Sequence, residues 1–338
     1  MHMADALLSP AVGGAMSAVS AAAIGYSVKK ISGKDFDEKQ IPMMGVMGAF
    51  VFAGQMINFT IPGTGSSGHI GGGILLAAVL GPFPALLTLT AVLLIQCLFF
   101  ADGGLLALGC NIFNMGFIPC LVIYPLLFRP LVKRNCTLPR ITAASILSVV
   151  VGLQLGAFGV VVQTLLSGIT ALPFSTFLLL MQPIHLAIGL VEGIITAAIL
   201  GFVWSLRPEL LETAARGGAL GSGVSVKRVV VSLAVLAVLV GGGLSLFASS
   251  YPDGLEWSME KTAGTAELEA EGPVFHLAAA IQEATAFLPD YDFASAGEEG
   301  VVGGTTVSGL AGGAMTFALA GAAGLLISKT RKRHTQSV

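Results

Sequence analysis

The stretch Gly71-Gly-Gly-Ile-Leu-Leu-Ala-Ala-Val-Leu-Gly-Pro-Phe83 decides how this chain folds. It is apolar but only 13 residues long. A helix needs about 20 residues to cross the hydrocarbon core of a bilayer. Longer apolar runs flank the stretch on both sides. Whether it crosses together with them determines the face of a membrane on which every later segment lies.

The composition is that of an integral membrane protein. Charged residues make up 11% of the 338 residues and hydrophobic residues 54%, and the mean hydropathy is +0.86. A soluble domain has roughly 25% charged residues. The 44 glycines agree with this class, because small residues let membrane helices approach closely. No basic segment or cleavage site marks a signal peptide near Met1, so we expect the N-terminus to be retained.

Basic residues give the orientation. Eight apolar runs are long enough to span a bilayer, at 10–28, 41–60, 84–100, 105–128, 141–168, 183–206, 228–249 and 308–328. Sixteen of the 17 basic residues fall in four short segments between or after these runs, at 29–39, 129–140, 207–228 and 329–333. The positive-inside rule places all four segments in the cytoplasm.

The number of crossings between Lys39 and Arg129 must therefore be even, but the long runs give only three. The parity holds if 71–83 also crosses, or dips far enough to act as a crossing. We thus expect an all-α membrane protein of nine membrane elements, seven before Arg207 and two after it. The N-terminus then lies outside and the C-terminus in the cytoplasm. Four segments share the outer face, at 61–70, 101–104, 169–182 and 250–307.

Two membrane modules are predicted. The first covers 1–206, and the polar, Gly-rich segment 207–227 is expected to be a cytoplasmic linker. The second covers 228–338 and consists of two spans that flank the outer segment 250–307. That segment holds 11 of the 19 acidic residues of the chain, among them Asp253 and Glu256. We interpret these acids as a solvated charged surface rather than a cation collector.

The N-terminal sequence Met1-His2-Met3-Ala4-Asp5 has the groups of a metal chelator. The α-amine of Met1, the backbone nitrogen of His2 and its ring Nδ1 can close small fused rings around one divalent ion. Nitrogen donors in a plane suit Ni²⁺ or Cu²⁺ better than Zn²⁺ or Mg²⁺. The competing interpretation of an isolated Met-His start is a polar, frayed terminus.

A Gly-rich loop supplies a fourth candidate ligand. Residues 61–73 contain too many glycines for a helix, so we expect irregular backbone that lines a cavity. His69 is the only strong ligand in this loop, and the predicted topology puts it on the same outer face as the N-terminus. The alternative is a turn with one solvated histidine.

Four motifs follow one another along the chain: Met1-His2 with Asp5 and Pro10, the loop around His69, the run Ala101–Gly116 and the segment His185–Thr196. In this order they resemble the substrate-capture (S) component of the energy-coupling factor transporters for nickel or cobalt, the CbiM/NikM family. Tyr251-Pro-Asp-Gly-Leu-Glu-Trp257 resembles the PDGLE signature of the small accessory subunit, here fused to the first.

The resemblance implies a seven-helix S-component bundle in 1–206 and a PDGLE module in 228–338. It implies that the Met1 amine, the backbone and ring nitrogens of His2 and the ring of His69 hold the ion in a near-square plane. Ni²⁺ or Co²⁺ is then the transported substrate, and no permanently bound cofactor is expected. The implied partners are a membrane-embedded coupling (T) protein and a pair of cytosolic ATPases, in a bacterial or archaeal cytoplasmic membrane.

Other polar residues are candidates for supporting roles. Five of them are expected to orient the ligands or to cap helices: Asp5, Ser67, Asp102, Asn111 and Asn114. His185 and Glu192 lie seven apart on one helix face, as an interior polar pair or as part of a transport relay. His276, His334 and the basic tail are assigned no role in binding metal or nucleic acid.

No phosphate-binding Gly-x-x-x-x-Gly-Lys-Ser/Thr loop is present, so we expect ATP hydrolysis in partner subunits and not in this chain. The alternative is a self-sufficient permease driven by an ion gradient, with Asp102, His185 and Glu192 as its relay. A third hypothesis is a metal sensor. The donor set leaves Ni²⁺ and Co²⁺ both open, with a preference for nickel because of the planar nitrogens.

Overall fold

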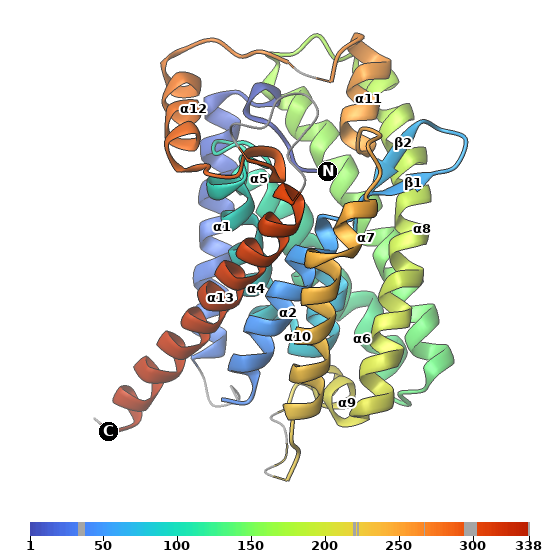
Figure 1. Ribbon diagram of the computed structural model, residues 1–338, viewed down its shortest axis with the longest axis vertical. Helices are drawn as coiled ribbons and strands as arrows, with labels where there is room; N and C mark the ends of the chain where they lie inside the picture. The colour runs from blue at the N-terminus through green and yellow to red at the C-terminus, as the bar shows by residue number, and fades with distance from the viewer. Residues whose placement is uncertain (33–37, 219–220, 222, 267, 294–302, 337–338) are drawn as a thin grey trace.

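The protein is described from a computed structural model, which covers residues 1–32, 38–218, 221, 223–266, 268–293 and 303–336 (Figure 1). Helices dominate it, and six are long and apolar enough to cross a membrane: Pro10–Ile31, Pro82–Phe99, Leu108–Lys133, Leu138–Ser167, Phe174–Leu206 and Gly304–Lys329. The all-α membrane class is confirmed. The count of nine membrane elements stays a prediction.

Five of these spans are α1 (Pro10–Ile31), α4 (Pro82–Phe99), α7 (Leu138–Ser167), α8 (Phe174–Leu206) and α13 (Gly304–Gln336). The remaining span joins α5 (Leu108–Asn111), the π-helix η2 (Ile112–Phe128) and α6 (Arg129–Lys133). Pro119 and Pro125 lie inside η2. Proline lacks an N–H and its ring clashes with a carbonyl one turn back, so a wider helical register accommodates both residues.

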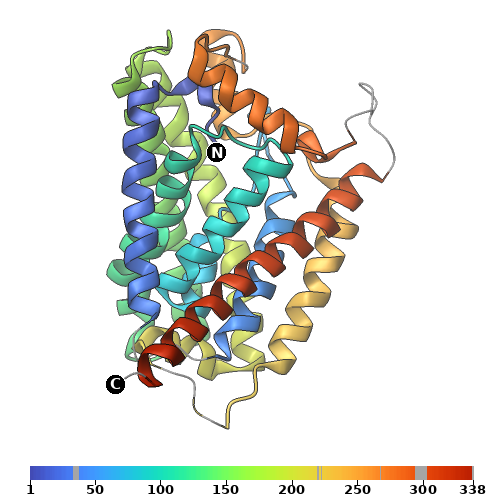
Figure 2. The same ribbon diagram turned by 90° about the vertical axis from the view of Figure 1, so that its left-hand side faces the viewer.

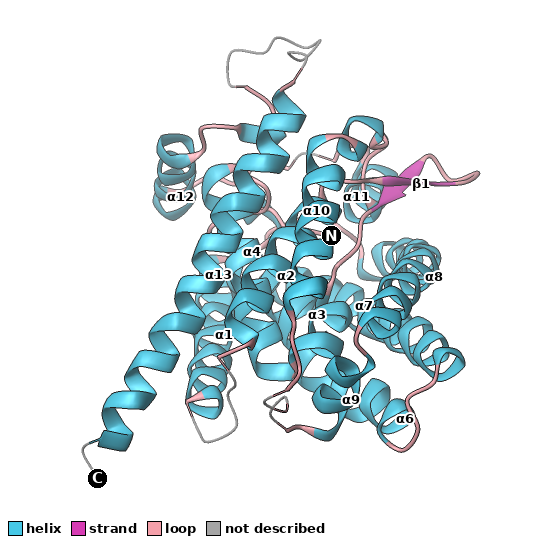
Figure 3. Cartoon of the chain, turned by 60° about the horizontal axis from the view of Figure 1, so that its bottom comes forward, coloured by secondary structure: helices cyan, strands magenta, loops and turns pink. Residues whose placement is uncertain are grey.

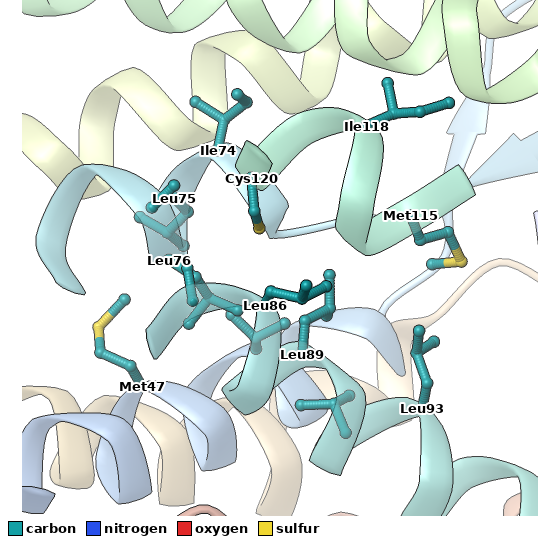
Figure 4. Close-up of a cluster of buried hydrophobic side chains, with 14 of the residues drawn as sticks. Met47, Ile74, Leu75, Leu76, Leu86, Leu89, Leu93, Met115, Ile118 and Cys120 are labelled. Atoms are coloured by element: carbon teal, nitrogen blue, oxygen red, sulfur yellow. The ribbon is translucent and has the colours of Figure 1, made fainter. Parts of the chain in front are cut away.

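The stretch 71–83 forms the short helix α3 (Gly73–Leu80) and the start of α4. All eight residues of α3 are buried. Figure 4 shows Ile74, Leu75 and Leu76 packed beside Leu86 of α4 and Cys120 of η2. The helix rises only about 12 Å.

Non-helical backbone at residues 69–72, before α3, lengthens this path. His69 lies near Met1 at one end of the bundle, and at the other end the Leu80 carbonyl accepts a hydrogen bond from Gln40 Nε2 at 3.3 Å. Left-handed backbone at Gly72 (φ 76°) and Gly81 (φ 82°) turns the chain into α3 and from α3 into α4. The segment therefore connects the two ends of the bundle.

The Gly-rich loop contains a β-hairpin where irregular backbone was expected. Strands β1 (Phe59–Ile61) and β2 (Ser66–Gly68) pair antiparallel, with Thr60 opposite Ser67 (Figure 3). Glycines at 63 and 65 adopt φ of 77° and 74°, which permits the tight reversal between the strands. The hairpin places the buried Ser67 and the following His69 at the mouth of the bundle.

The expected linker 207–227 is partly helical. Helix α9 (Pro208–Arg216) buries Leu210, Leu211 and Ala215 and packs against α3, α6 and α8. Arg129 Nε donates to the Ala215 carbonyl at 2.7 Å. The apolar residues of α9 recur at helical spacing. The prediction of a linker considered only the polar, Gly-rich composition of the whole segment and therefore missed this helix. Residues 219, 220 and 222 of this segment lie outside the described residues.

The C-terminal part packs directly on the first. Helix α2 (Gln40–Gln55) contacts both α10 (Lys227–Gly242) and α13, and α13 also contacts α4. The outer segment 250–307 is not an open loop. It contains α11 (Gly254–Ala263), α12 (Pro273–Thr285) and the short turn η4 (Pro289–Tyr291), which follow the turn η3 (Leu244–Phe247). Residues 267 and 294–302 of it lie outside the described residues.

The two ends of the molecule differ. Figure 1 places α11, α12 and the hairpin at the upper end, while the end of α1, α6, α9 and the end of α13 lie at the lower end. Figure 2 shows the same separation from the side. The lower elements carry or adjoin the four basic segments, of which Lys34 lies outside the described residues. The basic segments thus share one end of the bundle, as the sequence predicted, although the sidedness itself stays a prediction.

Candidate metal site at the N-terminus

The first residues of the chain are held inside the upper end of the bundle. Met1 and Met3 are 7% and 0% exposed. The Met3 amide donates to Asn111 Oδ1 at 2.8 Å, and the Met3 carbonyl accepts from Asn111 Nδ2 at 3.2 Å and from the Gly104 amide at 2.9 Å. Asp5 Oδ1 accepts from the Ala107 amide at 2.9 Å, just after the turn 101–104. The described terminus is therefore docked rather than frayed.

The α-amine of Met1 points at two side chains from distant parts of the sequence. It lies 3.3 Å from His69 Nε2 and forms a short ion pair with Asp253 Oδ2. His69 Nδ1 donates to its neighbouring Ile70 carbonyl at 3.0 Å. Because Nδ1 carries the hydrogen in this arrangement, Nε2 presents a lone pair to the amine. His69 thus has the form that binds a metal ion.

His2 completes the cluster from the other side. Its ring stacks on that of His69, with ring centroids 5.2 Å apart and planes 15° apart. His2 Nδ1 lies 3.2 Å from Asp102 Oδ1, and Asp102 also accepts a short hydrogen bond from the Tyr291 hydroxyl. His2 Nε2 is buried, and no partner for it occurs among the described residues. Chelation through Nδ1 therefore requires the ring to turn away from Asp102.

Burial sets the charges of these groups. Burial and the nearby Met1 ammonium lower the pKa of His69 to about 3. Burial also lowers the pKa of His2, although Asp102 acts in the opposite direction. Burial alone would raise the pKa of Asp253, but the Met1 ammonium and His69 outweigh it and hold that pKa below its usual value. Two neutral imidazoles and one carboxylate thus surround the amine.

The predicted supporting residues have separate partners. Asn111 holds Met3, while Asn114 exchanges hydrogen bonds with Gln163 at 2.7 and 3.1 Å. Asp102 contacts His2, and Asp5 accepts from the backbone after the turn. The Ser67 amide donates to the Pro252 carbonyl at 2.8 Å and its hydroxyl to the Tyr251 carbonyl at 2.7 Å. Ser67 therefore holds the segment that carries Asp253.

Asp253 is the functional candidate that the sequence interpretation missed. Its side chain is only 14% exposed, so the interpretation of this acid as part of a solvated surface is wrong. Asp253 Oδ1 accepts from the amides of Leu255 and Glu256, and Glu256 returns a bond to the Asp253 amide, which is a capping box at the start of α11. The spacing Asp253-x-x-Glu256 is a sequence signal that predicts this arrangement.

His185 and Glu192 both lie buried on α8 but are not bonded to each other within the described residues. His185 Nδ1 donates to the Met181 carbonyl at 2.8 Å, one turn back on the same helix. Glu192 Oε1 accepts from the Gly72 amide at 3.0 Å, at the N-terminus of α3. Glu192 therefore joins α8 to the stretch that follows His69, whereas His185 bonds within its own helix.

Two cavities meet at this site. The inner cavity has a volume of about 40 Å³, and its lining includes Met1, His69, His185, Glu192, Asp253 and Gly254. The outer vestibule, of about 440 Å³, is acidic, and its lining includes His2, Asp5, Asp102, Asp253, Glu256 and His276. Asp253 lines both spaces. It therefore lies where the vestibule meets the inner cavity.

Side chains alone do not form a metal site here. No group of three or more His, Cys, Asp or Glu side chains within the described ranges is arranged to hold a metal ion. Any site at this position must therefore include the terminal amine or backbone nitrogens. The structure brings Met1, His2 and His69 together, which is the juxtaposition that such a site requires.

Comparison with known proteins gives a consistent result. Residues 2–210 match a family model described as a cobalt uptake substrate-specific transmembrane region, CbiM, and residues 227–329 match a PDGLE domain. A putative fused nickel transport protein, NikMN, of Archaeoglobus fulgidus is 32% identical over 94% of this chain and 96% of its own length.

Further relatives match the first region. A cobalt transport protein CbiM of Sorangium cellulosum is 31% identical over 51% of this chain and 76% of its own length. A crystal structure of a truncated transition metal transporter superposes with a TM-score of 0.54 at 30% identity, and covers 61% of this chain and 99% of the other.

Proposed function

Because this chain belongs to the CbiM family of cobalt uptake membrane proteins and carries a PDGLE domain behind that region, we propose that it captures Ni²⁺ or Co²⁺ on the outer face of a cytoplasmic membrane and delivers the ion for uptake. It acts as the substrate-capture component of an energy-coupling factor importer. The N-terminus and the acidic vestibule face outward, and the basic lower end faces the cytoplasm.

The convergence of Met1, His2 and His69 carries this proposal. The amine lies 3.3 Å from a ligand-ready imidazole nitrogen and next to the second histidine, in a buried setting. In the structure the ammonium occupies the place between His69 and Asp253. A divalent ion takes that place when the amine gives up its proton, and the His2 amide and ring nitrogens complete the chelate.

Asp253 balances charge at this exchange. A divalent ion bound only by neutral nitrogens leaves an unpaired charge in a buried site, which is unfavourable. In the empty site the Asp253 carboxylate neutralises the Met1 ammonium. In the loaded site it neutralises part of the charge of the ion. Through Asp253 the PDGLE domain closes the outer side of the capture site.

Energy for uptake comes from partner proteins in this proposal. The sequence has no phosphate-binding loop, so a pair of cytosolic ATPases and a coupling (T) protein in the membrane are required. The competing function is a permease that works alone on an ion gradient. Reconstitution of the chain alone in liposomes separates the two: we expect no concentrative uptake under a proton gradient, and uptake without ATP would support the permease.

The ligand set is tested at the N-terminus itself. One residue inserted before Met1 moves the amine out of the chelate ring, and we expect Ni²⁺ affinity in isothermal titration to fall by at least a hundredfold. His2→Ala and His69→Ala should each cause a comparable loss. His276→Ala, in the vestibule, is the matched control and should leave the affinity unchanged. Unaltered binding by the extended chain would exclude the amine as a ligand.

The choice between nickel and cobalt is open to direct measurement. A planar set of nitrogen donors favours Ni²⁺, whose tetragonal preference it satisfies. We therefore expect the nickel-loaded protein to show the absorption of a square-planar centre and to hold nickel more tightly than cobalt in competition. An octahedral spectrum would contradict the four-nitrogen plane.

A further inference from the structure

His185 shares its hydrogen-bonding pattern with His69. In both residues Nδ1 faces a backbone carbonyl, that of Met181 at 2.8 Å and that of Ile70 at 3.0 Å. This bond fixes the hydrogen on Nδ1 and leaves Nε2 as a bare lone pair, the arrangement usual for histidines that bind metal. Both histidines line the inner cavity.

The Nε2 atom of His185 has no hydrogen-bond partner among the described residues, although the side chain is only 1% exposed. Buried polar atoms without a partner are rare, and each one calls for a bound water or ion. A Cβ built on Gly254 would lie 3.2 Å from this nitrogen, so His185 reaches the glycine that follows Asp253. The free nitrogen thus lies beside the segment that carries Asp253, in the cavity that Met1 and His69 also line.

Glu192 supplies a carboxylate deeper in the same cavity. One of its oxygens accepts from the Gly72 amide, and both oxygens lie within 3.6 Å of a Cβ built on Gly71. Seven residues separate His185 from Glu192, which corresponds to about 10 Å along the helix axis. An imidazole nitrogen and a carboxylate oxygen are donors that Ni²⁺ and Co²⁺ both accept.

The size of the cavity decides what can enter it. Its volume of about 40 Å³ has room for about three or four waters, at about 10–15 Å³ each. An ion with a full shell of six waters does not fit, whereas an ion already stripped by the capture site does. The cavity therefore suits a partly dehydrated ion that comes from the Met1–His69 end.

We infer that the inner cavity is a second, weaker metal site, in which His185 Nε2 receives the transported divalent ion from the capture site and passes it toward the Glu192 carboxylate. This inference rests on the proposed capture function. Movement into this second site would be the first inward step of the imported ion. His185 and Glu192 would then contact the substrate directly.

The experiment uses the full chain in lipid nanodiscs and Co²⁺, whose absorption reports its ligands. The chain has five histidines, so His276 and His334 are first replaced by alanine to leave only His2, His69 and His185. We expect a tight first equivalent of Co²⁺ and a second one that binds at least a hundredfold more weakly.

Two near-isosteric variants test the second equivalent. His185→Asn keeps a donor for the Met181 carbonyl but removes the Nε2 ligand, and should abolish the second equivalent while it leaves the first. Glu192→Gln keeps an acceptor for the Gly72 amide and should weaken the second equivalent at least tenfold. Melting curves close to that of the parent chain exclude unfolding as the cause.

Two results would overturn the inference. One is that the parent chain binds only a single equivalent of Co²⁺, and the other is that the His185→Asn variant still binds a second equivalent. The capture function is judged separately. His69→Ala should remove the first equivalent and keep the second. Should the first equivalent survive His69→Ala, the proposed capture site fails, whatever the second equivalent does.

Discussion

Met1 is the residue through which we expect pH to act on the proposed capture site. The ion must replace a proton on the ammonium that contacts His69 and Asp253. The pKa of His69 is lowered to about 3, so this imidazole is already neutral near pH 7 and does not compete. Because the ion replaces protons on its nitrogen ligands, we expect Ni²⁺ affinity to fall as the pH is lowered, by about tenfold per pH unit for each proton released. Titrations in buffers of different ionisation heat would count the protons, and an affinity independent of pH would contradict the exchange.

His69 also makes folding depend on pH. Its pKa is about 6.5 when unfolded and lower when folded, so the unfolded chain binds the proton first. Stability from this residue is full above pH 6.5 and is lost as pH falls toward 3. At pH 5 the free energy of unfolding is lower by about 2 kcal/mol because of this residue. We expect the melting temperature to drop between pH 7.5 and pH 5, and the drop to be smaller in His69→Gln than in His276→Ala.

The variant Asp253→Asn removes the negative charge of this side chain but keeps its size and shape. Asparagine also caps a helix N-terminus, so α11 should keep its start and its contacts with the hairpin. The ammonium and the bound ion both lose their counter-charge. We expect Ni²⁺ affinity to fall at least tenfold, with little change in melting temperature. Glu256→Gln, on the same capping box, is the control for helix α11. Equal effects of the two variants would assign Asp253 a capping role only.

The sequence predicted the proximity of Met1, His2 and His69 because crossing parity put them on one face. It did not predict Asp253, since the acids of 250–307 were interpreted together as one solvated surface. It named Asp102 among the residues that orient the ligands or cap helices, but it did not identify His2 Nδ1 as the atom that Asp102 contacts. Such contacts depend on tertiary positions that no spacing encodes.

At the scale of elements, short structures inside polar or Gly-rich segments escaped prediction. The hairpin 59–68 has strands of three residues each, and α9 has nine. Neither length gives a clear period in a sequence window. Six of the eight predicted apolar spans correspond to helices long enough to cross a membrane, because burial in lipid requires an uninterrupted apolar run. Local chemistry still explains the missed elements, through Gly63 and Gly65 in the turn and Pro208 at the start of α9.

Close backbone packing holds α13 in place. A Cβ built on Gly309 would lie 2.1 Å from the Gly241 carbonyl oxygen of α10. Backbone cannot move aside as a side chain does, so we expect Gly309→Ala to lower the free energy of unfolding by about 1–3 kcal/mol or more. Gly321→Ala is the control in the same helix, since nothing lies within 4 Å of its Cβ position. Unfolding in mixed micelles measures both, and equal stability of the two variants would contradict this contact.

At the scale of the whole molecule, the position of the basic segments at one end of the bundle constrains the path of the chain. Basic residues at one end of the bundle require that 71–83 bring the chain back across it. In the structure this segment consists of a buried helix of eight residues together with the non-helical backbone that precedes it. That same non-helical backbone carries His69 and lies against Glu192. This short segment therefore also builds the inner side of the candidate metal site.

The PDGLE region is held by contacts as well as by the covalent connection. Helices α10 and α13 pack on α2, Ser67 binds the Pro252 backbone, and Trp257 Nε1 donates to the Thr64 carbonyl at 3.0 Å. We expect a chain cleaved at a protease site inserted between residues 217 and 224 to elute as one complex. Its Ni²⁺ affinity should stay within about threefold of the intact chain, because Asp253 remains beside Met1. Separation of the cleaved parent chain would instead show that the linker alone keeps the PDGLE region over the site.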